Sequence, residues 1–361
     1  MRQKRPNKNK LYQWTMTVIT VFLVGLSTSS TVSAEEEPLG YTVDIIEPET
    51  QIDKTKDFFN IQTRPGEVQT IQAIVKSLRK EPVTIKVFAE NAMTNEAGQI
   101  NYSDDKSILD KSLVTPISDM VKILTPEVTV ANQEEKIVEI QVSPPEESYE
   151  GIKLADLAFQ LQDENEQGKS GVGSMFAYRI GLLTMEEDID YADSKTVKLV
   201  KVTPNIHRGK KTLLVRFQNP EPKILSNFTL AYSLTKKGSQ KPIKEESTQN
   251  HNMAPNSNFN FPIDLGMDNA SAGEYTLKVT IENTYGSWDF NEAVQITGSQ
   301  AKKMNDESAF KLLTPVWIKG IAIGMAVLSV ISSIVIFYRQ SKWKTKLKEQ
   351  RKKKKKKRGR K

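Results

Sequence analysis

The sequence predicts an all-β fold, in which two tandem immunoglobulin-like antiparallel β-sandwiches are followed by one C-terminal transmembrane helix. Between residues 40 and 298, apolar and polar residues alternate in many short runs, which are separated by turn residues such as Pro, Gly and Asn. The same region shows no sustained helical stripe. Residues 320–338, in contrast, contain no charged side chain. The alternation therefore predicts the sandwiches, and the uncharged run predicts the helix.

The first 34 residues have the features of a secretion signal peptide. Several Lys and Arg residues precede an uncharged, largely apolar run at 14–26. The small residues Val32, Ser33 and Ala34 follow, so we expect cleavage after Ala34. A retained N-terminal anchor is the alternative, but the apolar run is shorter than the roughly 20 residues that a membrane-spanning helix needs.

Residues 35–190 are predicted to form the first sandwich. The alternating residues of its strand faces include Val83, Ile85, Val87, Val138, Ile140, Val142, Phe176, Tyr178, Ile180 and Leu182. The segment GKSGVG at 168–173 superficially resembles a phosphate-binding loop. It lacks the required spacing and opens no helix, so we interpret it as a hairpin loop. An acidic, weakly patterned stretch at 185–195 predicts the boundary to the next domain.

Residues 193–298 are predicted to form the second sandwich. The alternating residues of its strand faces include Leu213, Val215, Phe217, Phe228, Leu230, Tyr232, Leu234, Tyr275, Leu277, Val279 and Ile281. The polar segment that follows, residues 299–314, is predicted to be a stalk that leads to the membrane.

The transmembrane helix is predicted over residues 316–338. Its uncharged run is long enough to cross a hydrocarbon core of about 30 Å, and Trp317 and Tyr338 lie where aromatic side chains meet the membrane interface. A buried core helix is the alternative, but polar segments flank the run on both sides. Gly320 and Gly324 form a G-x-x-x-G pair, which is only a weak indication of dimerisation because small residues are common in membrane spans.

Residues 339–361 form a Lys- and Arg-rich tail in which Glu349 is the sole acidic residue. Directly after a membrane-spanning helix, such a block is typical of a segment retained in the cytoplasm by the positive-inside rule. We therefore expect a single-pass protein of the cell membrane whose N-terminal domains lie outside the cell. Nucleic acid binding is the alternative for a basic block, and attraction to anionic inner-leaflet lipid is a possible additional role.

The region between the signal peptide and the helix is acidic, although the whole chain has a net charge of +7. Its acidity disfavours DNA or RNA as a partner. The chain contains no cysteine, which excludes disulfides and thiolate chemistry. An exported chain without cysteine favours a Gram-positive surface over an animal extracellular protein.

Candidate catalytic residues are few. The chain has two histidines, His207 and His251, and both lie in turn-like contexts without the neighbouring ligands that a zinc site needs. The abundant carboxylates are interpreted as solvated turn residues. A glycosidase stays an alternative, because its two carboxylates need not be close in sequence. We expect no catalytic residue, no metal site and no cofactor.

Nine segments of the chain resemble, in order, the WxL-interacting proteins of Gram-positive bacteria. In the first predicted domain they are DFFNIQTRPGEVQT (57–70), AENAMTNEAGQINY (89–102), VSPPEESYEGIKLADLAF (142–159) and FAYRIGLL (176–183). In the second they are VKLVKVTPNI (197–206), RFQNPEPKIL (216–225), NMAPNSNFNFPIDL (252–265), AGEYTLKV (272–279) and SWDFNEAVQI (287–296). One departure follows Gly151, where Ile152 to Asp156 stand in place of a glycine-rich continuation.

The resemblance implies a non-enzymatic adaptor of the cell surface. In that family the first domain binds peptidoglycan and the second binds host or matrix proteins, and both act in a complex with WxL-domain proteins. The implied partners are therefore peptidoglycan, WxL-domain surface proteins and host extracellular-matrix proteins. Two alternatives stay open: a cell-wall-modifying enzyme on a β-sandwich scaffold, and a surface receptor that relays a signal through its basic tail.

The Asn-rich stretch 250–265 is predicted to be a turn followed by a half-buried edge strand. Phe259, Phe261, Ile263 and Leu265 alternate with Asn258, Asn260, Pro262 and Asp264. Pro262 has no N–H to donate, which favours an edge position or a bulge. Turn chemistry accounts for most of the Asn and Ser residues. Asn258 and Asn260 are nevertheless the candidate binding residues, because an exposed edge can receive a partner strand.

Overall fold

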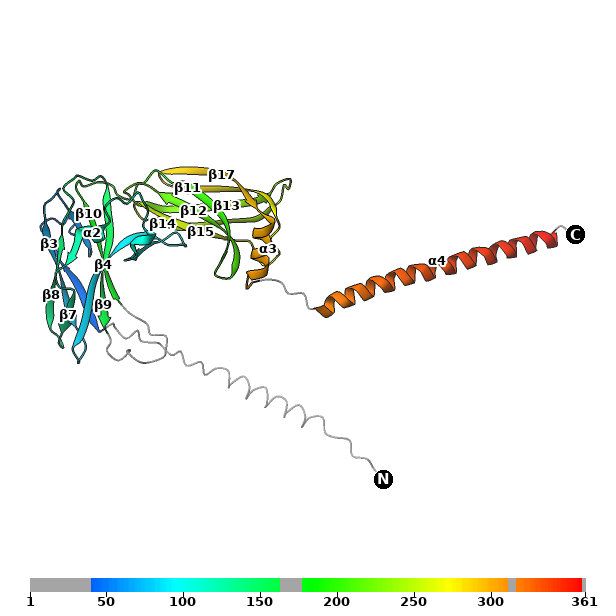
Figure 1. The fold of residues 1–361 in the computed structure, drawn as a ribbon, viewed down its shortest axis with the longest axis horizontal. Helices are drawn as coiled ribbons and strands as arrows, with labels where there is room; N and C mark the ends of the chain where they lie inside the picture. Colours follow the sequence, from blue (N-terminus) through cyan, green and yellow to red (C-terminus); the bar gives the residue numbers. More distant parts are fainter. Residues whose placement is uncertain (1–39, 163–176, 311–315, 359–361) are drawn as a thin grey trace, which may run out of the picture.

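The computed structural model describes residues 40–162, 177–310 and 316–358 (Figure 1). The fold is all-β, with two sandwiches in succession and one long helix at the C-terminal end, as predicted. The predicted signal peptide with its cleavage site after Ala34 and the GKSGVG loop at 168–173 lie outside the described residues.

The first sandwich consists of two sheets built from the first ten strands. These are β1 (Tyr41–Ile46), β2 (Phe59–Gln62), β3 (Gln69–Ser77), β4 (Val83–Thr94), β5 (Ile100–Ser103), β6 (Val121–Ile123), β7 (Glu127–Val130), β8 (Glu135–Val142), β9 (Ile152–Gln162) and β10 (Ala177–Met185). One sheet has the order β1-β3-β8-β6, and the other has the order β2-β10-β9-β4-β5 with β7 beside β4. The short helices η1 (Lys106–Ile108) and α2 (Ile117–Met120) lie between β5 and β6.

The strand pairing of the first sandwich departs from the expected antiparallel pattern at one place. β2 runs parallel to β10, because after β1 the chain crosses to the other sheet. The core lies where the alternation predicted it. Fully buried side chains include Ile71, Ile85, Val138, Ile140 and Phe159.

The second sandwich consists of β11 (Lys198–His207), β12 (Lys210–Asn219), β13 (Leu225–Lys236), β14 (Pro242–Met253), β15 (Ser257–Asp264), β16 (Gly273–Asn283) and β17 (Gly286–Ile296). Its sheets have the orders β11-β12-β15 and β14-β13-β16-β17. β15 is an edge strand, which confirms the prediction from Pro262. Its odd-numbered residues Phe259 and Ile263 are buried, whereas Asn260 is exposed.

The segment predicted as a polar stalk instead begins with a helix that packs on the second sandwich. α3 (Gly298–Glu307) starts at Thr297, whose side chain accepts a hydrogen bond from the N–H of Gln300 in a capping box. Ala301 and Met304, three residues apart, are buried in the core of the second sandwich. Two apolar residues with this spacing suffice for a short docked helix, and they were too few for a helical stripe to be recognised in the sequence.

The chain is also held after α3. Lys211 of β12 is 0% exposed, and its Nζ donates to the carbonyl oxygens of Met267 and Phe310 at 3.1 and 3.0 Å. The N–H of Ala309 donates to the carbonyl oxygen of Gly209 at 2.9 Å. The last described residues before the C-terminal helix are therefore fixed to the turn between β11 and β12.

The C-terminal helix α4 (Val316–Arg358) has 43 residues and projects away from the sandwiches (Figure 1). It continues past residue 338, where the apolar run ends, into the basic tail. Its part Gly320–Lys344 is the single helix among the described residues that is long and apolar enough to cross a membrane, by length and composition.

Candidate binding groove between the two sandwiches

The hairpin formed by β4 and β5 reaches from the first sandwich to the second. In its turn, Oδ1 of Asn95 accepts hydrogen bonds from the N–H groups of Ala97 and Gln99 at 2.9 and 3.1 Å. Gly98 has a φ of 67°, in the left-handed region that favours glycine. A Cβ atom at Gly98 would lie 2.8 Å from Nδ1 of His251. The hairpin tip therefore packs directly against the second sandwich.

Polar groups at this contact are paired between the two sandwiches. The buried hydroxyl groups of Thr94 and Ser257 lie 2.6 Å apart. His251 is 7% exposed, and its Nδ1 lies 2.9 Å from the carbonyl oxygen of Ala97. Its Nε2 lies 2.7 Å from Oγ1 of Thr248. Because buried polar groups need such partners, His251 acts here as a structural residue.

Asp110 ties the loop after β5 to the second sandwich. Its carboxylate accepts hydrogen bonds from Nδ2 of Asn258 at 2.5 Å and from Nε2 of Gln218 at 2.8 Å. Burial by itself would raise the pKa of Asp110, but hydrogen bonds from Ser112, Gln218 and Asn258 outweigh it and hold the pKa below its usual value. The carboxylate thus stays ionised and joins the two sandwiches.

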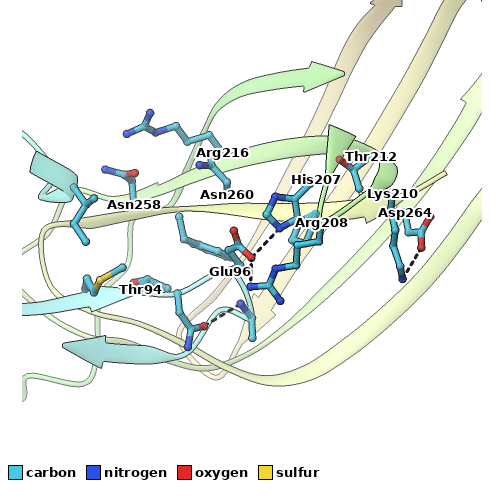
Figure 2. Close-up of a pocket in the computed structure, with 16 residues that line it drawn as sticks. Thr94, Glu96, His207, Arg208, Lys210, Thr212, Arg216, Asn258, Asn260 and Asp264 are labelled. Atoms are coloured by element: carbon cyan, nitrogen blue, oxygen red, sulfur yellow. Dashed lines mark hydrogen bonds and ion pairs between the residues drawn. The ribbon is translucent and has the colours of Figure 1, made fainter. Parts of the chain in front are cut away.

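The turn between β11 and β12 meets the tip of the same hairpin. The Glu96 carboxylate lies 3.0 Å from Nε2 of His207 and 2.9 Å from a guanidinium nitrogen of Arg208 (Figure 2). Nearby, Nζ of Lys210 lies 3.1 Å from the carboxylate of Asp264 on β15. These contacts close the turn end of the space between the hairpin and the second sandwich.

A groove of about 800 Å³ lies among these contacts, a size within the roughly 300–1,000 Å³ that is usual for ligand sites. One wall is the β4–β5 turn together with Ile108, and the other comes from the β11–β12 turn, β12 and β15 (Figure 2). The lining residues of β15 are Asn258, Phe259, Asn260, Pro262 and Asp264. Since the ring of Phe259 is buried in the core, its presence in the lining indicates that the groove borders the backbone edge of β15.

Two adjacent regions of the chain match families of binding domains. Residues 41–161 match the family described as WxL Interacting Protein, peptidoglycan binding domain. Residues 167–306 match the family described as WxL Interacting Protein, host binding domain. The chain belongs to the WxL-interacting protein family. Its function is accordingly that of a surface protein with binding domains for peptidoglycan and for a further partner.

The solved structures to which the chain is similar share little sequence identity with it and have low TM-scores. A PapD-like domain of human CEP192 shares 13% identity at a TM-score of 0.28 and covers 45% of this chain and 98% of its own. A chaperone–tip adhesin complex of CFA/I fimbriae shares 11% identity at a TM-score of 0.30, and the match covers 72% of this chain and 100% of the other. The CsuC–CsuE complex of Acinetobacter baumannii shares 11% identity at a TM-score of 0.29, and the match covers 62% of this chain and 90% of the other. Such low scores carry no argument about function. Among curated proteins, none matches the chain significantly.

The two predicted binding residues of this WxL-interacting protein have different surroundings. Asn258 is half-buried and donates to Asp110, so it contributes to the contact between the sandwiches. Asn260, two residues further along β15, is exposed and lines the groove. The sequence did not indicate that residues 94–97 and 207–210 would lie beside this strand, because only the tertiary structure brings the two hairpins together.

A second cluster of charged residues lies inside the peptidoglycan-binding region. Arg179 on β10 forms ion pairs with Glu90 on β4 and with Asp156 on β9. Glu90 and Asp156 are both buried. Burial raises the pKa of Asp156 to about 6, although Arg179 opposes this effect. The cluster was not recognised in the sequence, where Asp156 appeared only in the segment that departs from the family pattern.

The described residues contain no group of three or more His, Cys, Asp or Glu side chains placed to hold a metal ion. His207 and His251, the candidates weighed for catalysis, both contact the β4–β5 hairpin. They contact different residues of this turn, Glu96 and Ala97, and neither is paired with a serine nucleophile in the groove.

Proposed function

We propose that the protein is a membrane-anchored adaptor of the cell surface, without enzymatic activity. The first sandwich, residues 35–190, binds peptidoglycan, and the second, residues 193–298, binds a WxL-domain protein or a host matrix protein. The apolar part of α4 anchors the chain in the membrane as a single pass, with the sandwiches outside and the basic tail inside. The observation that carries this proposal is the order of the parts: two binding-domain matches, then a helix long enough to cross a membrane.

The contacts between the sandwiches support a role as an adaptor. The β4–β5 hairpin, Asp110 and Glu96 all bind the second sandwich. A small apolar cluster also spans the boundary, in which Ile152 packs near Ile224. Two binding modules joined this firmly keep one relative orientation, so a wall polymer and a partner protein are held at a fixed distance from each other.

Within the second sandwich, β15 is the proposed edge for the partner. Asn260 faces the groove and is the residue that the partner contacts. Asn258 holds the strand to Asp110 and therefore supports this edge without meeting the partner itself. An exposed edge strand beside a groove is a usual site for an added peptide strand.

Co-sedimentation tests the proposal. The detergent-solubilised full-length chain is mixed with insoluble peptidoglycan, and separately with an immobilised WxL-domain protein. We expect the chain to sediment with the polymer and to be captured by the protein, while the polymer releases no soluble fragments. Release of soluble fragments would instead support a wall-modifying enzyme. Absence of both sedimentation and capture would contradict the adaptor function.

A further inference from the structure

The outer edge of β15 carries backbone groups that are not paired with another strand. Among the described strands, β15 pairs with β12 alone. The N–H of Leu265 donates to the carbonyl oxygen of Lys211 on β12, so the odd-numbered residues of β15 direct their backbone groups to β12 and the even-numbered residues direct theirs outward. Pro262, which has no N–H, occupies one of the outward positions. Among the described residues, no backbone hydrogen bond joins Asn260 or Asp264 to a further strand.

One cation without an ionic partner among the described residues lines the groove, and a second lies one strand further from the β15 edge. Arg216 on β12 lies opposite Asn260 in the strand register, and Lys201 on β11 lies opposite Arg216. All three residues are exposed. Within the described part of the chain, neither cation forms an ion pair or hydrogen bond. The groove's carboxylates, in contrast, are paired with its other basic side chains. The unpaired charge on this side of the groove is therefore positive.

The opposite wall of the groove is partly apolar. Ile108 is 42% exposed and lines the groove, as does Met93. An extended peptide places successive side chains on opposite faces. A peptide along β15 would therefore present one set of side chains on the face of Arg216 and the other set on the opposite face.

We propose that the groove receives an extended, acidic segment of the partner protein, which adds to β15 as a further strand and places a carboxylate at Arg216. The proposal rests on the adaptor function and names the chemistry of its partner. Strand addition satisfies the outward backbone groups of Asn260 and Asp264, and a carboxylate satisfies the guanidinium group of Arg216. An uncharged glycan would supply neither the regular backbone pairing nor the negative charge.

Binding of synthetic peptides tests the backbone pairing. Fluorescence polarisation is measured with the detergent-solubilised full-length chain and a short peptide in which Glu alternates with Val. The comparison peptides replace Glu by Lys, or carry N-methyl groups on alternate residues, in two versions that cover both registers. We expect the Glu peptide to bind and the Lys peptide not to bind. The N-methylated version that blocks the edge-facing N–H groups should lose roughly tenfold or more in affinity, because it loses backbone hydrogen bonds.

Matched variants test the same contact from the protein side. Asn260→Pro removes one outward N–H without removing a bond to β12, and Asn260→Ala keeps that N–H. We expect affinity for the Glu peptide to fall roughly tenfold in N260P and to change by less than about threefold in N260A. The midpoint of thermal unfolding of each variant checks that both fold.

The charged contact has its own pair of variants. Arg216→Gln should weaken binding of the Glu peptide by roughly two- to fivefold, and added salt should reduce this difference. Lys201→Gln should have a smaller effect, because Lys201 lies one strand further from β15. Lys278→Gln is the control, because Lys278 on β16 in the other sheet is exposed and has no ionic partner among the described residues. Its substitution should leave affinity unchanged.

Two results with the peptides would overturn the inference, and one result with the partner protein would do so as well. The first is equal binding of the Glu and Lys peptides. The second is binding of the Glu peptide that neither N-methylation nor N260P weakens. The adaptor function is judged separately: if R216Q and N260P capture the WxL-domain protein as well as the original chain does, the groove is not the partner site, and the adaptor function stands. If the original chain captures no protein and sediments with no polymer, the adaptor function itself fails.

Discussion

Two neighbouring stretches of β15 use the same residue type for different purposes. Around Asn258, the strand lies against the first sandwich, and the polar groups there are paired with each other. Around Asn260, the strand borders the groove, where the guanidinium group of Arg216 has no partner among the described residues. The first stretch is a structural contact, and the second is a free surface. The distinction predicts opposite outcomes for substitutions that lie only two residues apart.

The comparison also explains why the groove has a defined shape. Its walls come from two domains, so its width depends on the closed contact beside it. The β4–β5 turn is fixed at Thr94 and Gly98 and reaches the β11–β12 turn at Glu96. Substitutions that loosen the contact should therefore change both stability and the groove, whereas substitutions in the groove should change binding alone.

Gly98→Ala should have the largest effect on stability. The new Cβ would lie 2.8 Å from Nδ1 of His251, and the backbone has a φ of 67°. The left-handed backbone alone costs about 1–2 kcal/mol for a residue with a side chain, and the clash with His251 adds to it. We expect a loss of about 2–4 kcal/mol in the free energy of unfolding, measured by denaturant unfolding of the detergent-solubilised chain.

Gly238→Ala is the matched control for that substitution. Gly238 also has a positive φ, of 83°, but a Cβ there would have no neighbour within 4 Å. The loss of stability in this variant therefore measures the cost of the left-handed backbone alone, without a steric clash. If the two variants lose the same stability, the tip of the β4–β5 hairpin does not pack as closely as the structure has it.

Asp110→Ala should have the next largest effect. It leaves the side-chain amides of Asn258 and Gln218 without their acceptor, which costs about 1–3 kcal/mol. The pKa of Asp110 is lowered in the folded protein. Its contribution is therefore present above the usual pKa of an Asp and is lost as the pH falls through the lowered value. The free energy of unfolding of D110A and of the original chain is measured at neutral pH and in strong acid. We expect the difference between the two proteins to be smaller in acid; an equal difference at both pH values would contradict this role.

The sequence predicts the sandwiches well because alternation in a strand directly reports which face is buried. Leu213, Val215 and Phe217 alternate in the sequence and are all fully buried. The edge position of β15 could also be predicted, since Pro262 lacks the N–H that an inner strand needs. These features depend only on residues that are neighbours in the chain.

The groove could not be predicted in the same way, because its walls are far apart in the sequence. Nothing local to Glu96 indicates that His207 and Arg208 would be its partners. The docking of α3 was not predicted for a related reason. Ala301 and Met304 form a short apolar face, and only the folded structure shows that it packs on the core of the second sandwich. Asn258 and Asn260 look equivalent in the sequence, and only the position of Asp110 separates them.

A buried acid outside both stretches should respond to pH with the opposite sign to Asp110. Burial raises the pKa of Asp156 to about 6, above the ordinary value for an unfolded chain. The ionised form therefore destabilises the fold above that pH. Stability rises as the pH falls through about 6 towards the ordinary pKa of an Asp, by at most about 1.4 kcal/mol per pH unit for one proton. Asp156→Asn should remove this part of the pH dependence. If D156N and the original chain follow parallel curves, Asp156 is not the titrating group.

Glu96→Gln should have the smallest effect and is the sharpest test of the difference between contact and groove. The Glu96 side chain is 40% exposed, and its partner Arg208 is 78% exposed, so water screens the ion pair. Exposed pairs of this kind contribute about 0–1 kcal/mol, and we expect E96Q to lose less than about 1 kcal/mol in denaturant unfolding. The substitution also removes one negative charge from the groove. If an acidic strand binds there, E96Q should bind the Glu peptide at least as tightly as the original chain does. A large loss of stability would instead show that Glu96 belongs to the structural contact between the sandwiches. That contact would then include the hairpin tip as well as the surroundings of Asn258.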